Sequence, residues 1–447
     1  MLIKSLDASL KASLGASLKA LGAGLGLGLV LLTGCSTVSL DEPQRLCAPG
    51  SANTSARSGE LACPDNAPAP ERAAAPRETP PDADAAPLQT RPVPLPGQES
   101  AANAALPAAR NGGPVRIALL LPMKSPSLGG AAESVRAGFM ASAERDGAGV
   151  EVELLATSDS TDDALAAYSK ASASHDVIVG PLARPAVSAL AAGGPVSRPT
   201  VALNHPEQRG ALPPGMLVVG LSIEDEATQA AEWAAREHPH GRVLILTAKA
   251  AWSQRAAAAF EARWSELGHT SQRFPVPSAG GRVEPSAIAE LKSRLEIDPP
   301  ELMFAALDVV ELRQVRAETG TAIPCYAGSA GNPGRAPGLN LAELDGLRLV
   351  DVPWLVRPDD RTVMVYPRPL DTDQSLTMNR LYALGIDAFL VARELALHPG
   401  APFRIDGVTG QLAVDGAAND ANKLGLQRRE AMAVYRDGNF EATEQGP

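Results

Sequence analysis

From residue 115 onwards, apolar residues alternate between two spacings, and these spacings predict a series of strands and helices. The continuous apolar run over 115–121 is typical of a strand buried on both faces. In the next stretch, 131–145, Val135, Phe139 and Met140 recur at helical spacing. By the same criteria, further strands are predicted at 150–155, 176–179, 200–203, 217–220, 242–247, 302–306 and 323–326. The helices predicted between them are 162–173, 184–192, 224–237, 253–267, 285–295 and 309–319.

This alternation indicates βαβ units, and therefore an α/β fold with parallel sheets. The patterned region, 115–440, is too long for one open sheet of this kind, so we expect two lobes. The pattern changes towards the end of the region. A strand is expected at 347–356, the longest helix at 375–398 and a closing strand at 431–436.

The first 34 residues resemble a secretion signal. Three lysines precede an apolar stretch, Leu21 to Leu32, which is shorter than the ~20 residues that a spanning helix needs. It ends in Leu32-Thr33-Gly34-Cys35, which is similar to the lipobox of bacterial lipoproteins. This resemblance implies that Cys35 becomes the acylated N-terminus, and that Ser36 directs the protein to the outer membrane, facing the periplasm. The alternative is an ordinary signal peptide with a chance cysteine.

Residues 35–114 are rich in proline and alanine and have almost no aromatic or β-branched residues, so they cannot bury a core. We expect a disordered tether whose extended length could reach on the order of 200 Å. A spacer without further function remains the alternative. Cys47 and Cys63 lie within it, and an oxidising periplasm would allow a disulfide between them, although two free thiols remain the alternative there. Residues 441–447 are expected to be a tail.

Composition and motifs exclude several functions. The net charge is −11, which disfavours nucleic-acid binding because phosphate contacts need clustered lysine and arginine. The chain has no Gly-x-Ser-x-Gly elbow, no phosphate-binding Gly-x4-Gly-Lys-Ser/Thr loop and no His-Glu-x-x-His motif. We therefore expect no catalytic residue, no metal and no cofactor.

In open α/β folds, ligands bind at the carboxyl ends of the strands. The polar or stacking side chains that follow the predicted strands are the possible cleft contacts: Lys124, Asn204, His205, Trp252, Asp308 and Ser329. The loop 180–185 has no hydroxyl, Pro181 lacks a donor, and the loop 328–331 has no carboxylate, so an amino-acid ligand is disfavoured. The alternative is that Asp308 supplies the carboxylate.

The order of elements resembles the type I periplasmic-binding-protein fold, in which two Rossmann-like lobes are joined by three chain crossings. The Gly-Val-Thr-Gly-x-Leu-x-x-Asp turn over 407–415 looks like the last crossing of that fold, and the other crossings would lie near 221–224 and 353–357. Lobe 1 would then contain 115–222 and 356–408. Lobe 2 would contain 223–355 and 409–440.

A narrower resemblance is carried by Val-Gly-Pro-Leu at 179–182 and Arg-Leu-Tyr-Ala-Leu-Gly-Ile-Asp-Ala at 380–388. These segments are similar to the LppC/LpoA family, outer-membrane lipoproteins that activate penicillin-binding proteins, the peptidoglycan synthases. The longer members carry a helical-repeat domain where this chain has its tether. The resemblance implies a non-enzymatic regulator of cell-wall synthesis with a penicillin-binding protein as its partner. The alternatives are a lipid-anchored solute-binding receptor of an ABC import system and, with less support, a hydrolase using Asp or Ser in the cleft.

Overall fold

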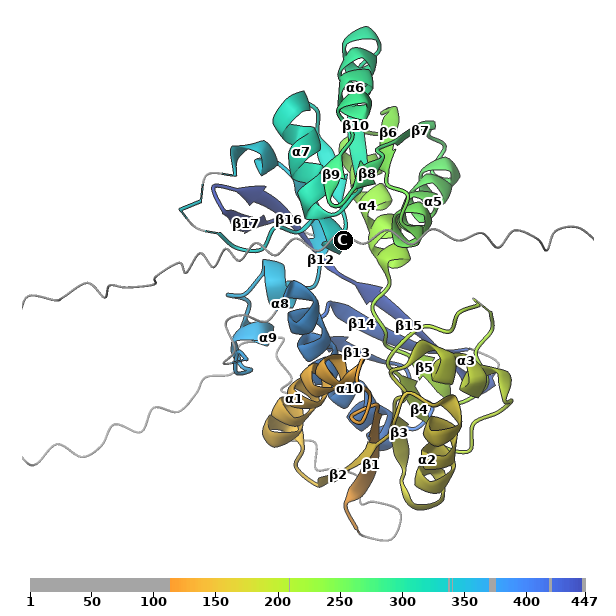
Figure 1. Cartoon of the computed structure of the whole chain (residues 1–447). Helices are drawn as coiled ribbons and strands as arrows, with labels where there is room; N and C mark the ends of the chain where they lie inside the picture. The colour runs from red at the N-terminus through yellow and green to blue at the C-terminus, as the bar shows by residue number, and fades with distance from the viewer. Residues whose placement is uncertain are drawn as a thin grey trace, which may run out of the picture. The chain divides into compact units, whose positions relative to one another are not determined.

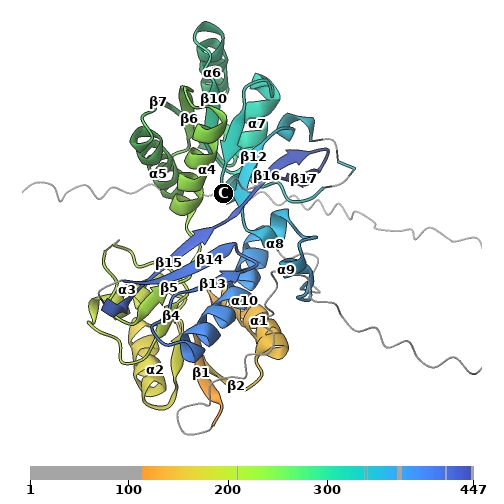
Figure 2. The same cartoon turned by 180° about the vertical axis from the view of Figure 1, so that it is seen from behind.

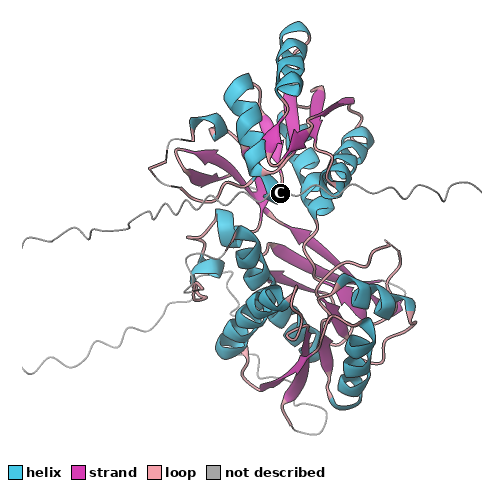
Figure 3. Cartoon of the chain, viewed as in Figure 1, coloured by secondary structure: helices cyan, strands magenta, loops and turns pink. Residues whose placement is uncertain are grey.

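The computed structural model describes residues 113–208, 210–336, 338–339, 341–369, 375–417 and 420–443. These residues all belong to one compact unit, Pro94–Pro447. Cys35, Cys47 and Cys63, and with them the predictions of acylation and of a disulfide, lie outside the described residues. Figures 1 and 3 show that the described residues form two α/β lobes, each built on its own sheet.

Lobe 1 contains a five-stranded parallel sheet with the order β2-β1-β3-β4-β5. Helices α1 and α10 cover one face of this sheet, and α2 and α3 cover the other. The strands are β1 (Val115–Leu121), β2 (Val150–Ala156), β3 (Val177–Val179), β4 (Thr200–Ala202) and β5 (Met216–Val218). The helices are α1 (Gly129–Asp146), α2 (Thr161–Ser174), α3 (Arg184–Ala192) and α10 (Leu376–Leu397).

Lobe 2 contains a seven-stranded sheet with the order β17-β16-β12-β11-β10-β6-β7. β16 pairs antiparallel with β12, and β17 pairs antiparallel with β16, whereas the other pairs of neighbouring strands are parallel. Helices cover both faces of the sheet. The strands are β6 (Val243–Thr247), β7 (Ser271–Pro275), β10 (Leu302–Ala306), β11 (Cys325–Ala327), β12 (Arg348–Asp351), β16 (Ala431–Arg436) and β17 (Asn439–Ala442). The helices are α4 (Ile223–Glu237), α5 (Ala251–Glu266), α6 (Pro285–Ile297) and α7 (Val309–Thr319). The hairpin β8 (Ser278–Ala279) and β9 (Arg282–Val283) precedes α6, and two short 3-10 turns, η2 (Ser329–Gly331) and η3 (Ala342–Leu344), precede β12.

A third, antiparallel sheet differs from the lobe assignment expected from the sequence. It consists of β13 (Phe403–Asp406), β14 (Gln411–Ala417) and β15 (Asp420–Arg429). Leu412 and Val414 of β14 share a hydrophobic cluster with Leu119 of β1, so this sheet packs on lobe 1. The assignment of residues 409–440 to lobe 2 therefore fails for β14 and β15. Only β16 and β17 join the sheet of lobe 2.

The chain passes between the lobes three times, and the predicted α/β class with two Rossmann-like lobes and three crossings is confirmed. The first crossing runs from β5 into α4, the second follows β12, and the third lies at Glu430, between β15 and β16 (Figure 2). The third crossing was expected near 407–412, where the glycines suggested a sharp turn. In the structure those residues form the β13–β14 turn within lobe 1. After the second crossing come two short helices, α8 (Pro353–Val356) and α9 (Arg361–Met364).

Helices α1 and α10 approach each other unusually closely because each has a glycine at the contact. A Cβ on Gly138 would lie 1.9 Å from the carbonyl oxygen of Tyr382. A Cβ on Gly385 would lie 2.1 Å from the carbonyl oxygen of Val135. Only glycine fits at either position, so this pair of glycines fixes where α10, and every side chain it carries, lies on lobe 1.

Candidate functional site: the crossing region between the lobes

Arg380, near the start of α10, connects lobe 1 to lobe 2. Its Nε and Nη2 donate to the two carboxylate oxygens of Asp351, at 2.9 and 2.6 Å, and Nη2 also donates to the carbonyl oxygen of Ser329 at 2.9 Å. Asp351 is the last residue of β12, and Ser329 follows β11. Burial alone would lower the pKa of Arg380, but the adjacent Asp351 carboxylate raises it above its ordinary value. A bidentate, buried ion pair of this kind holds both partners in one geometry.

Glu226, in the first turn of α4, binds the same loop of lobe 2. Its carboxylate accepts hydrogen bonds from the Ser329 backbone N–H at 2.8 Å and from the Ser329 hydroxyl at 2.9 Å. Burial and, after it, the negative charge of Asp351 raise the pKa of Glu226 to about 7, against the opposing effects of Ser329 and Arg380. Glu226 therefore exchanges its proton near neutral pH.

Asp387, two turns after Arg380 on α10, holds the β13–β14 turn. Its carboxylate accepts from the backbone N–H groups of Val408 and Thr409, at 2.9 and 2.7 Å, and from the Thr409 hydroxyl. A Cβ on Gly407 would lie 2.5 Å from this carboxylate, which explains the glycine at that position. Burial raises the pKa of Asp387, and the three donors partly oppose this.

Arg428 and Glu430 complete the network at the first and third crossings. Arg428 donates from Nη1 to the carbonyl oxygen of Gly220 at 2.9 Å, from Nη2 to that of Val219, and from Nε to the Thr409 hydroxyl at 3.1 Å. Burial lowers the pKa of Arg428. Burial and the nearby Glu226 raise the pKa of Glu430 well above its usual range.

The crossing network therefore consists of Glu226, Asp351, Glu430, Arg380 and Arg428. It connects all three crossings through buried charges, and Asp387 links Arg428 to α10 through the Thr409 hydroxyl that both contact. Chemically it is suited to setting the relation between the lobes and to binding or releasing a proton near neutral pH. None of these five residues is among the candidates predicted from the sequence. Arg380 and Asp387 both stand in the segment 380–388 that carries the family resemblance, and this was the signal that could have identified them.

Three of the six predicted cleft residues follow the carboxyl ends of β1, β6 and β10. Lys124 is exposed after β1, and Trp252 is half-buried in the first turn of α5. Asp308 caps α7, because its carboxylate accepts from the Glu311 backbone N–H at 2.8 Å. Lys124 belongs to lobe 1, whereas Trp252 and Asp308 follow the neighbouring strands β6 and β10 of lobe 2. Any contact that these side chains make with a ligand stays a prediction.

The other three predicted residues lie at the crossings. Asn204 donates from Nδ2 to the carbonyl oxygen of Leu182 at 3.2 Å, and His205 Nε2 lies 3.0 Å from the carbonyl oxygen of Gly220. Ser329 is bound by the crossing network, because its backbone N–H and its hydroxyl both donate to the Glu226 carboxylate. Their predicted binding role also stays a prediction.

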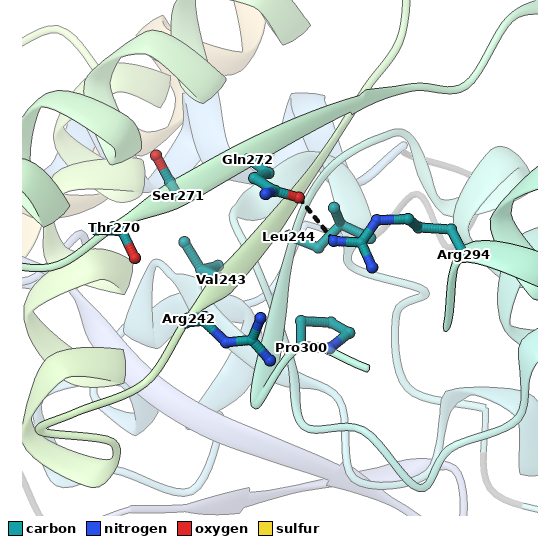
Figure 4. Close-up of a pocket in the computed structure, with 8 residues that line it drawn as sticks. All are labelled: Arg242, Val243, Leu244, Thr270, Ser271, Gln272, Arg294 and Pro300. Carbon is teal, nitrogen blue, oxygen red and sulfur yellow. Dashed lines mark hydrogen bonds between the residues drawn. The ribbon is translucent and has the colours of Figure 1, made fainter. Parts of the chain in front are cut away.

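Two cavities bear on ligand binding. One, of about 80 Å³, lies at the amino ends of β6 and β7, where Arg294 donates to Gln272 (Figure 4). It is small compared with the several hundred Å³ of ordinary ligand pockets. It also lies at the amino ends of the strands, whereas ligands of open α/β folds bind at the carboxyl ends. A larger one, of about 360 Å³, lies beside His205 and Asp225 and is lined mostly by apolar side chains. Within the described ranges, no cluster of three or more His, Cys, Asp or Glu side chains is arranged to hold a metal ion.

Two α/β lobes joined by three crossings define the type I periplasmic-binding-protein-like class. Within that class, the chain belongs to the family described as "LppC putative lipoprotein", whose model matches residues 104–274 and 292–427.

Curated relatives carry the name "Penicillin-binding protein activator LpoA". The protein from Photobacterium profundum is 27% identical over 369 residues, covering 73% of this chain and 57% of the relative. The protein from Edwardsiella piscicida is 29% identical over 311 residues, covering 60% of this chain and 43% of the relative. The chain thus matches about half the length of these relatives.

Solved structures share the fold. The C-domain of LpoA (YraM) from Haemophilus influenzae, titled a regulator of PBP1A, gives a TM-score of 0.58 at 22% identity, covering 74% of this chain and 100% of that one. A structure titled "putative branched-chain amino acid ABC transporter" from Chromobacterium violaceum ATCC 12472 gives 0.58 at 30% identity, covering 72% and 100%. Among the helices that the structure describes, none combines the length and apolar character needed to cross a membrane.

Proposed function

We propose that this chain is a lipid-anchored, non-enzymatic activator of a peptidoglycan synthase, acting from the outer membrane into the periplasm. The observation that carries the proposal is membership of the LppC family over most of the folded body, together with relatives named as penicillin-binding protein activators. The proposed arrangement is an acylated Cys35, a tether over 35–114 and the two-lobed body as the part that contacts the synthase.

The physical role of the body follows from the crossing network. Buried ion pairs and hydrogen bonds at the crossings favour one relation between the lobes, so the body presents a defined surface to its partner. Binding activates a synthase only if the body has a higher affinity for the active than for the inactive conformation of that enzyme. The tether would give the anchored body the reach to meet an enzyme of the inner membrane.

The decisive experiment measures glycan polymerisation by purified periplasmic synthases, with and without the full chain. The expected result is a faster rate with at least one synthase and direct binding to the same enzyme. If no synthase binds the chain or polymerises faster in its presence, the proposal is wrong.

The second candidate function is a solute-binding receptor. The specific observation in its favour is the 30% identity to the Chromobacterium violaceum protein over that protein's whole chain. The engagement of Ser329 by Glu226 weighs against it, because that hydroxyl and backbone N–H are then not available to a solute. A rise in melting temperature with one metabolite, and no effect on any synthase, would favour the receptor.

A further inference from the structure

The crossing network buries more acidic than basic groups. Glu226, Asp351 and Glu430 are 5%, 1% and 1% exposed, and they come from α4, from the end of β12 and from the third crossing. The cations that face them are Arg380 of α10 and Arg428 of β15. Three carboxylates against two guanidinium groups leave one negative charge unbalanced when all five groups are ionised. Because an unbalanced charge is costly to bury, the network as folded favours the binding of a proton.

Two further carboxylates face the network, and neither of them balances its charge. Asp387 of α10 lies near Arg428 but is held by three donors of the β13–β14 turn. Asp225, next to Glu226 on α4, is exposed and lies near Arg428 and Glu430. Both groups are acidic, so they can only add to the excess of negative charge.

The burial of these carboxylates depends on how the two lobes are placed. Ser329 is held from both lobes: Glu226 of lobe 2 accepts from its backbone N–H and hydroxyl, and Arg380 of lobe 1 donates to its carbonyl oxygen. Arg380 also binds Asp351, where the second crossing begins, and Glu430 lies in the third crossing, between β15 and β16 (Figure 2). A rotation of the lobes about the crossings would withdraw Arg380 and admit water to the carboxylates. Hydrated carboxylates no longer need a proton at neutral pH.

The contact between Glu226 and Ser329 suits a carboxyl group in either protonation state. Ser329 Oγ lies 2.9 Å from Glu226 Oε1, and a hydroxyl can donate to a carboxylate or accept from a carboxyl O–H. Burial and, after it, the charge of Asp351 raise the pKa of Glu226. Burial and the charge of Glu226 raise the pKa of Glu430, so the two glutamates titrate as a pair. Both therefore hold a proton more tightly in the observed arrangement than they would in water.

We propose that the crossing network is a proton-operated clamp between the lobes. Protons bound by Glu226 and Glu430 stabilise the observed relation, in which Arg380 contacts Asp351 and Ser329. Release of these protons to the solvent favours a second relation, with the lobes rotated apart about the crossings and the carboxylates hydrated. The clamp is a property of the two-lobed body, so it applies to a synthase activator and to a solute receptor alike.

The sign of the pH dependence follows from linkage. The pKa of Glu226 is about 7 in the observed relation, against an ordinary value of 4.5 for a hydrated glutamate. Raising the pH between these two values therefore shifts the population towards the rotated relation. The ratio of the two relations should change by up to about tenfold per pH unit for each proton released, and Glu226 should contribute no further change above about pH 7.

Pulsed electron paramagnetic resonance on the full chain can measure the distance between the lobes. One spin label replaces Lys124, which is exposed after β1 of lobe 1, and the other replaces Lys249, which is exposed after β6 of lobe 2. A ketone-bearing amino acid at each position takes the label, so the cysteines of the chain stay unlabelled. Distances recorded in steps from pH 5 to pH 8 should show a second population that grows until about pH 7 and then stays constant.

Variants separate the two glutamates from other titrating groups. In the double variant Glu226→Gln/Glu430→Gln the distance distribution should be the same at pH 5 and pH 8, because glutamine does not titrate. Glu226→Gln alone should respond less steeply than the unmodified chain. Glu290→Gln, at an exposed site on α6, is the matched control and should respond like the unmodified chain.

Two results would overturn the proposal. One is a distance distribution of the unmodified chain that does not change between pH 5 and pH 8. The other is a pH response that persists unchanged in the double variant, which would assign it to another group, such as His205 beside the first crossing. If the double variant unfolds, Glu226→Gln decides alone, and a response as steep as that of the unmodified chain then contradicts the clamp.

Discussion

Asp387 shows how much structure one buried carboxylate can organise. Replacement by asparagine leaves only one acceptor oxygen for three donors, so buried N–H groups of the β13–β14 turn lose their partners. We expect Asp387→Asn to lower the free energy of unfolding by about 2–4 kcal/mol, in line with breaking a buried hydrogen-bond network. Urea denaturation measures the loss. The control is Asp406→Asn, an exposed carboxylate on β13, which should change little. Equal stabilities for the two variants would contradict this role of Asp387.

Glu226 gives the protein a pH dependence whose sign can be worked out. Because its pKa in the folded state is about 7, above the ordinary value of 4.5, the native state holds this proton where the unfolded state has lost it. Its contribution to stability is therefore fully present below about pH 4.5 and is lost as the pH rises through about 7, with a size on the order of 1–3 kcal/mol.

Glu226→Gln tests this directly. Glutamine retains an acceptor for the Ser329 N–H and adds a donor for its hydroxyl, but it does not titrate. The unfolding free energy of the variant should depend less on pH between about 4.5 and 7. Other buried carboxyl groups whose pKa is raised by burial contribute to the remaining slope: Asp387, and Glu430, which faces Arg428, Asp351 and Asp225. Glu290→Gln, at an exposed site on α6, should leave the pH profile unchanged. A variant profile as steep as the original would show that Glu226 is not the titrating group.

The packing of α10 on α1 yields a prediction about helix contacts. Gly385→Ala places a methyl group within 2.1 Å of the Val135 carbonyl oxygen, so the helices must move apart. We expect a loss of at least about 1–3 kcal/mol in the free energy of unfolding, as for overpacked cores. Gly130→Ala in α1 is the control: nothing lies within 4 Å of its Cβ position, and the change should be neutral or stabilise by up to about 1 kcal/mol. Thermal unfolding compares the two, and a neutral Gly385→Ala would contradict the close packing.

The sequence predicted most of the buried elements, because their apolar spacing is strong. The strand β7 was missed. Its residues are polar except for the buried Phe274 and the terminal Pro275, because an edge strand needs only one apolar contact, and the apolar spacing is therefore absent. The strand expected over 347–356 is wrong in its second half: the strand ends at Asp351, and Pro353 begins α8. β14 was missed because the glycines of 407–415 were interpreted as a crossing, and β15 was not predicted either.

The crossing network could not be predicted in the same way. Glu226 lies in the acidic first turn of α4, where a carboxylate ordinarily faces solvent and interacts with the helix dipole. Its burial depends on Ser329, 103 residues later in the chain, and local patterns do not report contacts at that separation. For the same reason, Ser329 was predicted as a ligand contact when it is bound by the protein itself.

The molecule as a whole depends on Arg380, because it is the cation that links lobe 1 to Asp351 and Ser329 of lobe 2. Arg380→Ala leaves Asp351 and Glu226 as buried carboxylates without this counter-charge, and we expect a loss of about 3–5 kcal/mol. Because the lost bonds join the lobes, the lobes should also unfold less cooperatively. Calorimetry should show a broadened or split transition where the unmodified chain shows a single one.

The matching control is Arg348→Ala, which removes an ion pair with Glu237 inside lobe 2. It should lower the melting temperature of the chain while keeping a single transition, because the lobes stay coupled. If Arg380→Ala retains one sharp transition, the crossing network does not couple them. A third outcome is that Arg380→Ala splits the transition and abolishes activation of a synthase while binding to that synthase persists. The fixed relation between the lobes would then be part of the activating signal, because a partner that contacts one surface alone would not respond to a change in that relation.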